Sequence, residues 1–163
     1  MYWKTEDGLL LSCRTMEPTE DRIVYISRTE TFSAAHRLFN EKLTDVENEK
    51  IFGKCSAVNG HGHNYKVRVT LRGPVHPVTG MVFNLTILKR LMTECIMDVL
   101  DHKNINMDVP HFRHTVPTSE NIVIFIWNQL KKKLDDDLLY EVHMQSNESD
   151  AATYRGENAA GLS

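Results

Sequence analysis

Two histidines and a cysteine lie close together between Gly53 and Tyr65, a segment that reads GKCSAVNGHGHNY. His61 and His63 are two residues apart, and the residues from Tyr65 onward alternate between apolar and polar types, as in a half-buried strand. Side chains two residues apart in a strand point to the same face of the sheet, so the two imidazoles can share one tetrahedral metal ion. Cys55 precedes this pair by six residues.

A catalytic zinc usually has three protein ligands and one open position. The segment RTETFSAAHR offers His36 as the third ligand, with Phe32 and Ala34 in phase with it on one face of an extended strand. If the strands over 22–36 and 63–72 pair as neighbours, His36 meets His61 and His63, and the three form a zinc site. The motif HFRH contains a second pair, His111 and His114, but it lacks a third ligand and is expected on the surface.

The remaining pattern predicts the elements that position these residues. A helix is expected from Asn84, where apolar residues recur at three- and four-residue steps and place Cys95 in the core. A second helix is expected to start at Thr118 or Ser119, and short strands are expected over 140–144 and 151–155. This order predicts an α+β fold, with a four-stranded antiparallel sheet and two helices on one face.

The composition limits the function classes. The 163 residues are 41% hydrophobic and 25% charged, which suits one packed domain, expected over 22–157, between disordered segments at 1–21 and 158–163. The net charge of −3 gives no general attraction to nucleic acid or to an anionic membrane surface. The N-terminal segment does not read as a signal peptide, and the odd count of 3 cysteines suits a reducing compartment. The protein is expected to be cytoplasmic.

Five separated motifs resemble the 6-pyruvoyl tetrahydropterin synthase family and occur in its order. They are FSAAHRL (32–38), FGKCSAVNGHGHNYKV (52–67), PVTGMVFNLTILK (77–89), LDHKNIN (100–106) and PTSENIVIFIW (117–127). The gap between Cys55 and His61 resembles that of the animal-type enzymes. The resemblance implies the tunnelling fold, of ββααββ order, in which three subunits join their sheets into a barrel and two trimers form a homohexamer with active sites at subunit interfaces.

The resemblance also implies an activity, the conversion of 7,8-dihydroneopterin triphosphate to 6-pyruvoyl tetrahydropterin with release of triphosphate, in tetrahydrobiopterin biosynthesis. Zn²⁺ would be held by the three histidines. Cys55 would be the base, and Asp101 with His102 from a neighbouring subunit would be its proton relay. The pterin ring would be bound by Thr118, Ser119 and Glu120, and the triphosphate would need cations such as Lys54 and Arg37.

One departure from the family pattern bears on the predicted binding of the pterin ring. The family has a glutamate in the strand before the last one, which anchors the pterin ring, and a count without gaps places Ser146 there. Glu148 lies two residues further on and would share the face of Ser146 if the strand continued. Two alternatives therefore stay open: a zinc-binding paralogue with impaired catalysis, and an enzyme with a different product, either the carboxy-tetrahydropterin or a side-chain-cleaved pterin.

Overall fold

The computed structural model describes residues 22–135 and 137–158. The predicted extension over 1–21 and the end of the predicted tail, from residue 159, lie outside the described residues. None of the helices within the described ranges is long and apolar enough to cross a membrane.

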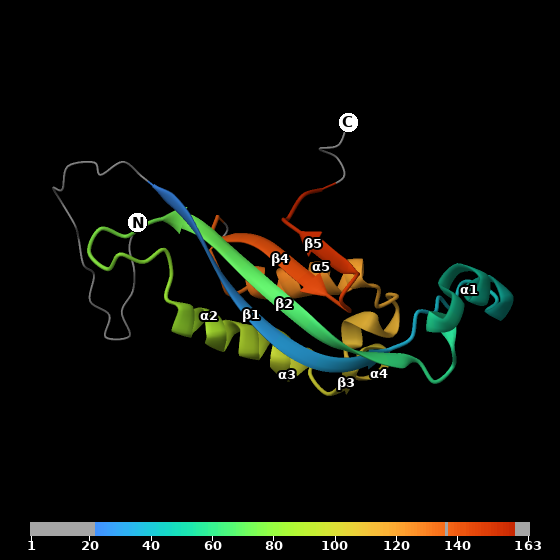
Figure 1. Ribbon diagram of the computed structural model, residues 1–163. Helices are drawn as coiled ribbons and strands as arrows, with labels where there is room; N and C mark the ends of the chain where they lie inside the picture. The colour runs from blue at the N-terminus through green and yellow to red at the C-terminus, as the bar shows by residue number, and fades with distance from the viewer. Residues whose placement is uncertain (1–21, 136, 159–163) are drawn as a thin grey trace.

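The described residues form a five-stranded sheet in the order β3-β1-β2-β4-β5 (Figure 1). Neighbouring strands among β1, β2, β4 and β5 are antiparallel, while β3 runs parallel to β1. The strands are β1 Ile23–His36, β2 His61–Pro74, β3 Lys103–Asn104, β4 Leu139–Gln145 and β5 Ala151–Tyr154.

β1 and β2 form the long central ladder of the sheet. Their pairing runs from Ile23 opposite Pro74 to His36 opposite His61 without a shift in register. The predicted alternation is present, because every second side chain of β2 from Tyr65 to Leu71 is fully buried under the helices. These buried residues are Tyr65, Val67, Val69 and Leu71, each 0% exposed.

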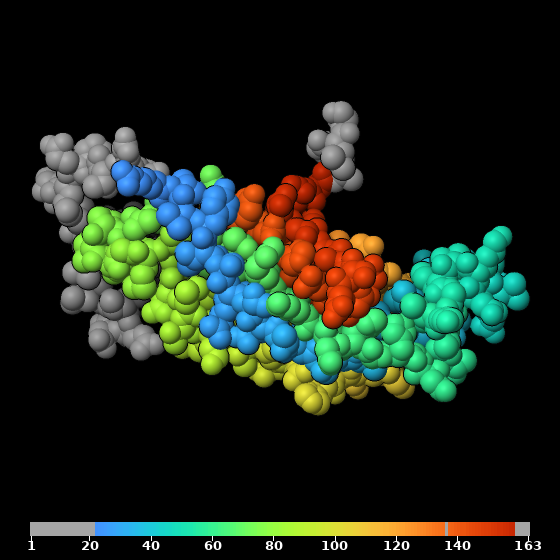
Figure 2. Space-filling model, in the orientation of Figure 1, coloured from blue at the N-terminus to red at the C-terminus, as the bar shows by residue number. Residues whose placement is uncertain are grey.

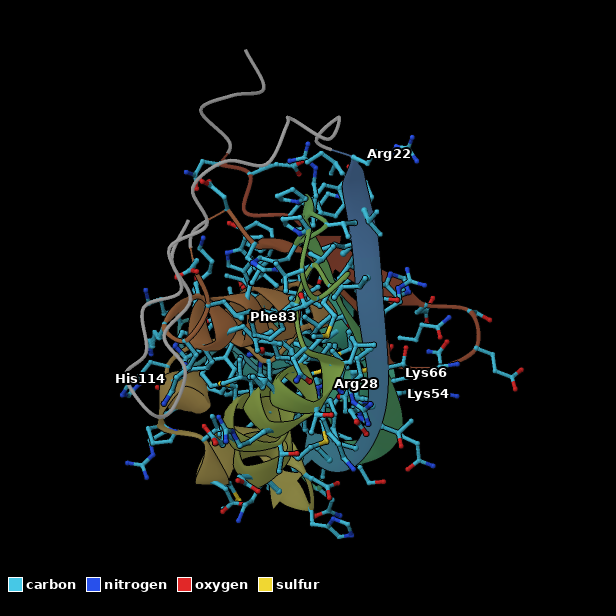
Figure 3. The ribbon with its side chains drawn as sticks, turned by 90° about the vertical axis from the view of Figure 1, so that its left-hand side faces the viewer. Arg22, Arg28, Lys54, Lys66, Phe83 and His114 are labelled. Carbon is cyan, nitrogen blue, oxygen red and sulfur yellow. The ribbon has the colours of Figure 1, made fainter. Side chains whose placement is uncertain are left out.

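The helices cover one face of this sheet, as the view along the molecule shows (Figure 3). Helix α2 (Leu85–Met92) continues through a π-helical turn, η2 (Thr93–Met97), into α3 (Asp98–Leu100). Helix α5 (Ser119–Lys131) begins at the N-cap Thr118, as predicted. The apolar residues of these helices pack against the buried face of the sheet to form one core, which includes Cys95. The α+β class is therefore confirmed.

Shorter elements connect the main ones. Helix α1 (Asp45–Phe52) begins with a capping box between Thr44 and Glu47. It is followed by the 3₁₀ turn η1 (Gly53–Ser56). Helix α4 (Ile105–Asp108) and the 3₁₀ turn η3 (Pro110–Arg113) lie between β3 and α5.

The predicted four-stranded antiparallel sheet was wrong in one respect: a fifth, parallel strand is present. The chain leaving α3 passes beside the end of β1, where β3 pairs with Ala34 and Ala35. His102 makes this turn in the left-handed region, with φ 58, and its backbone N–H donates to the Ser33 carbonyl at 2.7 Å. A strand of only two residues shows no alternation, so it could not be predicted from the pattern of apolar residues.

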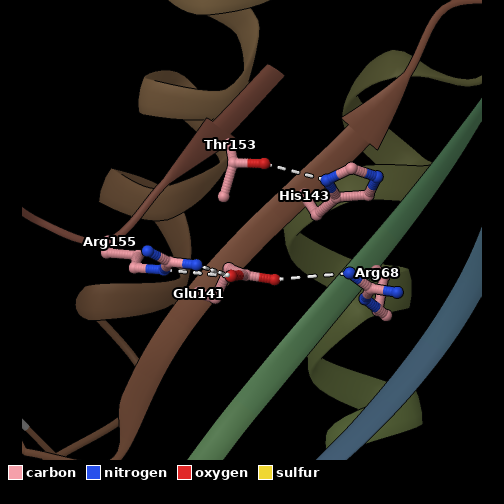
Figure 4. Close-up of polar contacts among 5 residues, drawn as sticks. All are labelled: Arg68, Glu141, His143, Thr153 and Arg155. Carbon is pink, nitrogen blue, oxygen red and sulfur yellow. Dashed lines mark hydrogen bonds and ion pairs between the residues drawn. The ribbon is translucent and has the colours of Figure 1, made fainter. Parts of the chain in front are cut away.

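No helix of the described residues lies over the other face of the sheet (Figure 2). Polar contacts link its strands there (Figure 4). The carboxylate of Glu141 on β4 accepts from Arg155 Nε and Nη2 at 3.0 and 2.9 Å, and Arg68 Nη2 on β2 lies 3.5 Å from its other oxygen. His143 Nδ1 lies 2.8 Å from the Thr153 hydroxyl. These contacts hold β2, β4 and the end of β5 together across the open face.

Candidate active site and metal centre

Three imidazoles converge at the end of the central ladder. His36 and His61 are direct cross-strand partners, and His63 lies one pleat further along β2 on the same face. The Nε2 atoms of His36 and His61 are 3.1 Å apart, and one ligand atom from each of the three rings lies within 4.8 Å of the others. The strand pairing predicted from the sequence therefore brings the three histidines together.

A hydrogen bond to the backbone fixes the orientation of His36. Its Nδ1 lies 2.8 Å from the carbonyl oxygen of Pro117, just before α5. A carbonyl can only accept, so Nδ1 carries the proton and the lone pair of Nε2 faces the other two rings. His63 is likewise hydrogen-bonded to the backbone of Ser146. The ring of Tyr65 packs next to His63, with the ring centroids 5.4 Å apart.

Burial keeps these imidazoles neutral. His36 is only 5% exposed, and desolvation is the main reason why its pKa is lowered from 6.5 to about 4. The hydrogen bond to Pro117 opposes this change, and the nearby His61 and His63 lower the pKa further. Desolvation, followed by the charge of His61, also lowers the pKa of His63. Neutral imidazole is the form that binds a metal, so both rings are ready to do so at neutral pH.

This donor set fits a divalent metal ion. Nitrogen ligands of tetrahedral zinc lie about 3.4 Å from one another, close to the 3.1 Å that separates His36 from His61. Three imidazoles without a fourth protein ligand are typical of catalytic rather than structural zinc. Among the described residues, these three form the group that could hold such an ion. His111 and His114 are both exposed and belong to no such group.

Cys55 lies half-buried on η1, next to the strand that carries His36. Its carbonyl accepts from the backbone N–H of Leu38, two residues after His36, at 2.9 Å. Gly53 ends α1 with φ 53, which turns the chain toward η1. Within the described residues, the Cys55 thiol has no hydrogen bond to the Asp101–His102 pair of its own chain.

Asp101 and His102 form a preorganised pair at the β3 edge. Asp101 Oδ2 lies 2.8 Å from His102 Nδ1, and Asp101 Oδ1 accepts from the backbone N–H of Ser33 at 2.8 Å. The Ser33 hydrogen bond, followed by the contacts with His102, lowers the pKa of Asp101. With Nδ1 donating to the carboxylate, His102 Nε2 is left as an acceptor on a side chain that is 84% exposed.

The three residues predicted to bind the ring begin α5. The Thr118 hydroxyl accepts from the backbone N–H of Asn121 at 3.3 Å and so caps the helix. Ser119 and Glu120 occupy the first turn, and Glu120 is exposed. Because Pro117 directly precedes them, this turn is tied to the metal centre through His36.

Ser146 and Glu148 lie in different settings. β4 ends at Gln145, and Ser146 is buried beside His63, only 8% exposed. The next residues form a turn in which the Asn147 side chain accepts from the backbone N–H groups of Ser149 and Asp150. The strand does not continue to Glu148, which is exposed at this turn and does not share a strand face with Ser146.

Sequence reasoning missed the backbone groups that orient the site. The Pro117 carbonyl and the Ser33 peptide act through the main chain, which no residue type marks. Tyr65 did carry a signal, because it follows His63 by two residues in the same alternating pattern.

Known proteins resemble this chain in sequence and in fold. Residues 25–157 match the family model described as 6-pyruvoyl tetrahydropterin synthase. A Poecilia reticulata protein named 6-pyruvoyl tetrahydrobiopterin synthase is 49% identical over 86% of this chain and 95% of its own length. The Homo sapiens protein of that name is 51% identical over 81% and 91%, respectively. The solved structure of Caenorhabditis elegans 6-pyruvoyl tetrahydropterin synthase aligns with a TM-score of 0.80 at 45% identity, over 83% of this chain and 97% of that one.

Proposed function

The chain belongs to the 6-pyruvoyl tetrahydropterin synthase family, and from this premise we propose that it is a zinc-dependent lyase of tetrahydrobiopterin biosynthesis. Its substrate is 7,8-dihydroneopterin triphosphate, and its products are 6-pyruvoyl tetrahydropterin and inorganic triphosphate. The observation that carries the proposal is the convergence of His36, His61 and His63 within reach of one metal ion. We place the enzyme in the cytoplasm.

The reaction needs protons to be moved from carbons that bear hydroxyl groups. Zn²⁺ bound by the three imidazoles would supply Lewis acidity at those hydroxyls. The elimination of triphosphate is redox-neutral, and the oxidation of the side chain is balanced by the reduction of the dihydropterin ring to the tetrahydro level, so no redox cofactor is required. The protein's own task is to hold a base beside the metal centre and to take the proton away.

Cys55 is the proposed base, and Asp101 with His102 is the relay that accepts the thiol proton. The hydrogen bond at 2.8 Å between His102 Nδ1 and Asp101 leaves Nε2 free to take that proton, and the carboxylate stabilises the imidazolium that forms. The exposed ring of His102 has no contact with the thiol of its own chain among the described residues. This favours delivery of the pair to a neighbouring subunit, in a homohexamer with active sites between chains.

The pterin ring is proposed to bind at the start of α5. Thr118, Ser119 and Glu120 lie beside the carbonyl of Pro117, which holds His36, so a ring bound there would place its side chain at the metal. Two residues are candidates for the position of the family's anchoring glutamate. Ser146 occupies the buried position beside His63, while Glu148 lies on the exposed turn.

The alternative, a zinc-binding paralogue with impaired catalysis, is favoured by Ser146 alone. Serine cannot offer the bidentate, charged hydrogen bonds of a carboxylate. The test is to incubate zinc-loaded protein with 7,8-dihydroneopterin triphosphate, to quantify released triphosphate, and to determine the mass of the pterin product. Turnover to 6-pyruvoyl tetrahydropterin supports the lyase. No turnover supports the paralogue, and the mass of a carboxy-tetrahydropterin or a side-chain-cleaved pterin supports the third alternative.

A further inference from the structure

A cavity lies next to the candidate metal centre, between loops that are distant in the sequence. Its volume is about 800 Å³, and its walls come from the loop after β1, the residues before β2, and the segment from β3 to the start of α5. These segments meet at the end of the sheet where α1 and α4 lie (Figure 1). No step of the proposed mechanism uses this cavity.

The cavity carries a local excess of positive charge. Arg37, Lys42 and Arg113 line it together with His114, whereas Glu41 is the carboxylate among its lining residues. The whole chain has a net charge of −3, so this concentration of cations is a local feature and not a consequence of overall composition. A concave site with one sign of charge concentrates ligands of the opposite sign.

Most of these cations are available to a ligand. No hydrogen bond or ion pair with the described residues engages the Lys42 ammonium, the Arg113 guanidinium or the His114 ring. Arg37 is fixed in place, because its Nε donates to the carbonyl of Ser56 at 2.7 Å and its guanidinium carbon lies 3.9 Å from the centroid of the Phe39 ring. The cavity thus offers one oriented cation and three side chains that can move toward an anion.

Several residues that line the cavity are direct neighbours in the chain of residues at the candidate metal centre. Arg37 follows His36, Gly60 precedes His61, and Val116 precedes Pro117, whose carbonyl holds His36. Gly60 has φ 64, and a Cβ there would lie 2.6 Å from the carbonyl oxygen of His36. The close approach of these two backbones fixes the wall between the cavity and the histidines. A ligand bound at the metal therefore has this cavity as its neighbour.

We propose that this cavity binds a polyphosphate chain, with Arg37, Lys42 and Arg113 as its charged ligands and His114 as an additional donor. The identification of that chain with the triphosphate of the substrate rests on the proposed function. Guanidinium and ammonium groups are the usual protein ligands of phosphate oxygens. Lys54, the other cation suggested by the sequence, does not line the cavity, and it lies on the opposite side of β1 from His114 (Figure 3).

The test uses inorganic triphosphate as the probe and the zinc-loaded, full-length protein. Calorimetric titration of the wild type is compared with Arg113→Ala and Lys42→Ala, and with Lys132→Ala as a control for an exposed lysine elsewhere. We expect the dissociation constant for triphosphate to rise about tenfold or more in each cavity variant, because one charge-assisted hydrogen bond is lost. In the control it should stay within about twofold of the wild-type value. The KM for the pterin substrate should rise in parallel, with a smaller change in kcat.

Two results would overturn the proposal. One is a wild type that binds no inorganic triphosphate. The other is Arg113→Ala and Lys42→Ala proteins that bind triphosphate as tightly as the wild type, as they would if triphosphate were held by the metal alone. Both binding results can be distinguished from a failure of the proposed function. In that case the wild type would show no turnover but would still bind triphosphate through these residues.

Discussion

At the scale of single residues, the protonation state of the histidines decides whether the candidate metal centre can bind a metal ion. The Pro117 carbonyl keeps the proton of His36 on Nδ1, and burial keeps the ring neutral. The sequence predicted which three histidines converge, because their spacing in strands fixes the face they occupy. It did not predict the tautomer, since the partner that sets it is a backbone oxygen 81 residues away in the chain.

Because burial lowers the pKa of His36 to about 4, the stability of the metal-free protein should depend on pH. The unfolded chain takes up a proton near the ordinary pKa of 6.5, where the folded chain does not, so acid favours unfolding. The free energy of unfolding should therefore fall by about 3 kcal/mol as the pH is lowered from 6.5 to 4, and level off below that.

Denaturant unfolding of chelator-treated protein at a series of pH values measures this dependence. His36→Asn should show a clearly smaller pH dependence than the wild type over the same range. Equal slopes in the two proteins would show that His36 is not the titrating group.

The two cysteines within the described residues should behave differently. Cys55→Ala should lower turnover about a hundredfold or more, because a general base is lost, while zinc content stays unchanged. Cys95 is buried, and desolvation raises the pKa of its thiol, so Cys95→Ala should retain turnover. Turnover and metal content measured on both variants check this. Normal turnover in Cys55→Ala would remove that thiol from the mechanism.

At the scale of elements, the sequence predicted what has a clear period or a cap. The β1–β2 ladder and both long helices were expected and are present. The two-residue strand β3 and the π-helical turn Thr93–Met97 were not expected, because neither produces its own pattern of apolar residues. The pairing of β3 with β1 holds the turn of Asp101 and His102, the proposed relay, in place.

The connection into β2 depends on Gly60. An alanine there would combine an unfavourable backbone conformation with a Cβ placed 2.6 Å from the His36 carbonyl oxygen. We expect Gly60→Ala to lower the free energy of unfolding by about 3 kcal/mol or more. Gly80 is a matched control, with φ 68 and no atom within 4 Å of an added Cβ. Gly80→Ala should cost only about 1 kcal/mol, the conformational part alone.

Denaturant unfolding of the two glycine variants beside the wild type measures the difference. Equal losses of stability in Gly60→Ala and Gly80→Ala would show that the close approach to His36 can relax without cost.

At the scale of the whole molecule, several features of the described chain favour the proposed active site between subunits. The sheet leaves most of the outer edge of β1 unpaired, since β3 covers only Ala34 and Ala35, and its second face has no helix over it. The proposed relay residue His102 is also exposed, at 84%. These features were not predictable from residue patterns, which describe one chain, and they favour assembly with further copies that supply the missing contacts.

Assembly can be tested by complementation between two inactive variants. Cys55→Ala and His102→Ala chains carrying different tags are coexpressed, and oligomers with both tags are purified. If Cys55 and His102 of one site come from different chains, random mixing restores intact pairs at about a quarter of the sites, and turnover should recover to that level. Mixed oligomers as inactive as their parents would show that each chain supplies both residues to its own site.

The central claim is that turnover takes place at one metal ion held by His36, His61 and His63. The most direct measurement is the rate of triphosphate release from 7,8-dihydroneopterin triphosphate while zinc is added back to chelator-stripped protein, with His61→Ala and the surface variant His111→Ala in parallel. The account predicts no turnover without metal, a rise that saturates at one zinc ion per chain in the wild type and in His111→Ala, and no recovery in His61→Ala. Full turnover in the stripped protein, or full recovery in His61→Ala, would contradict it.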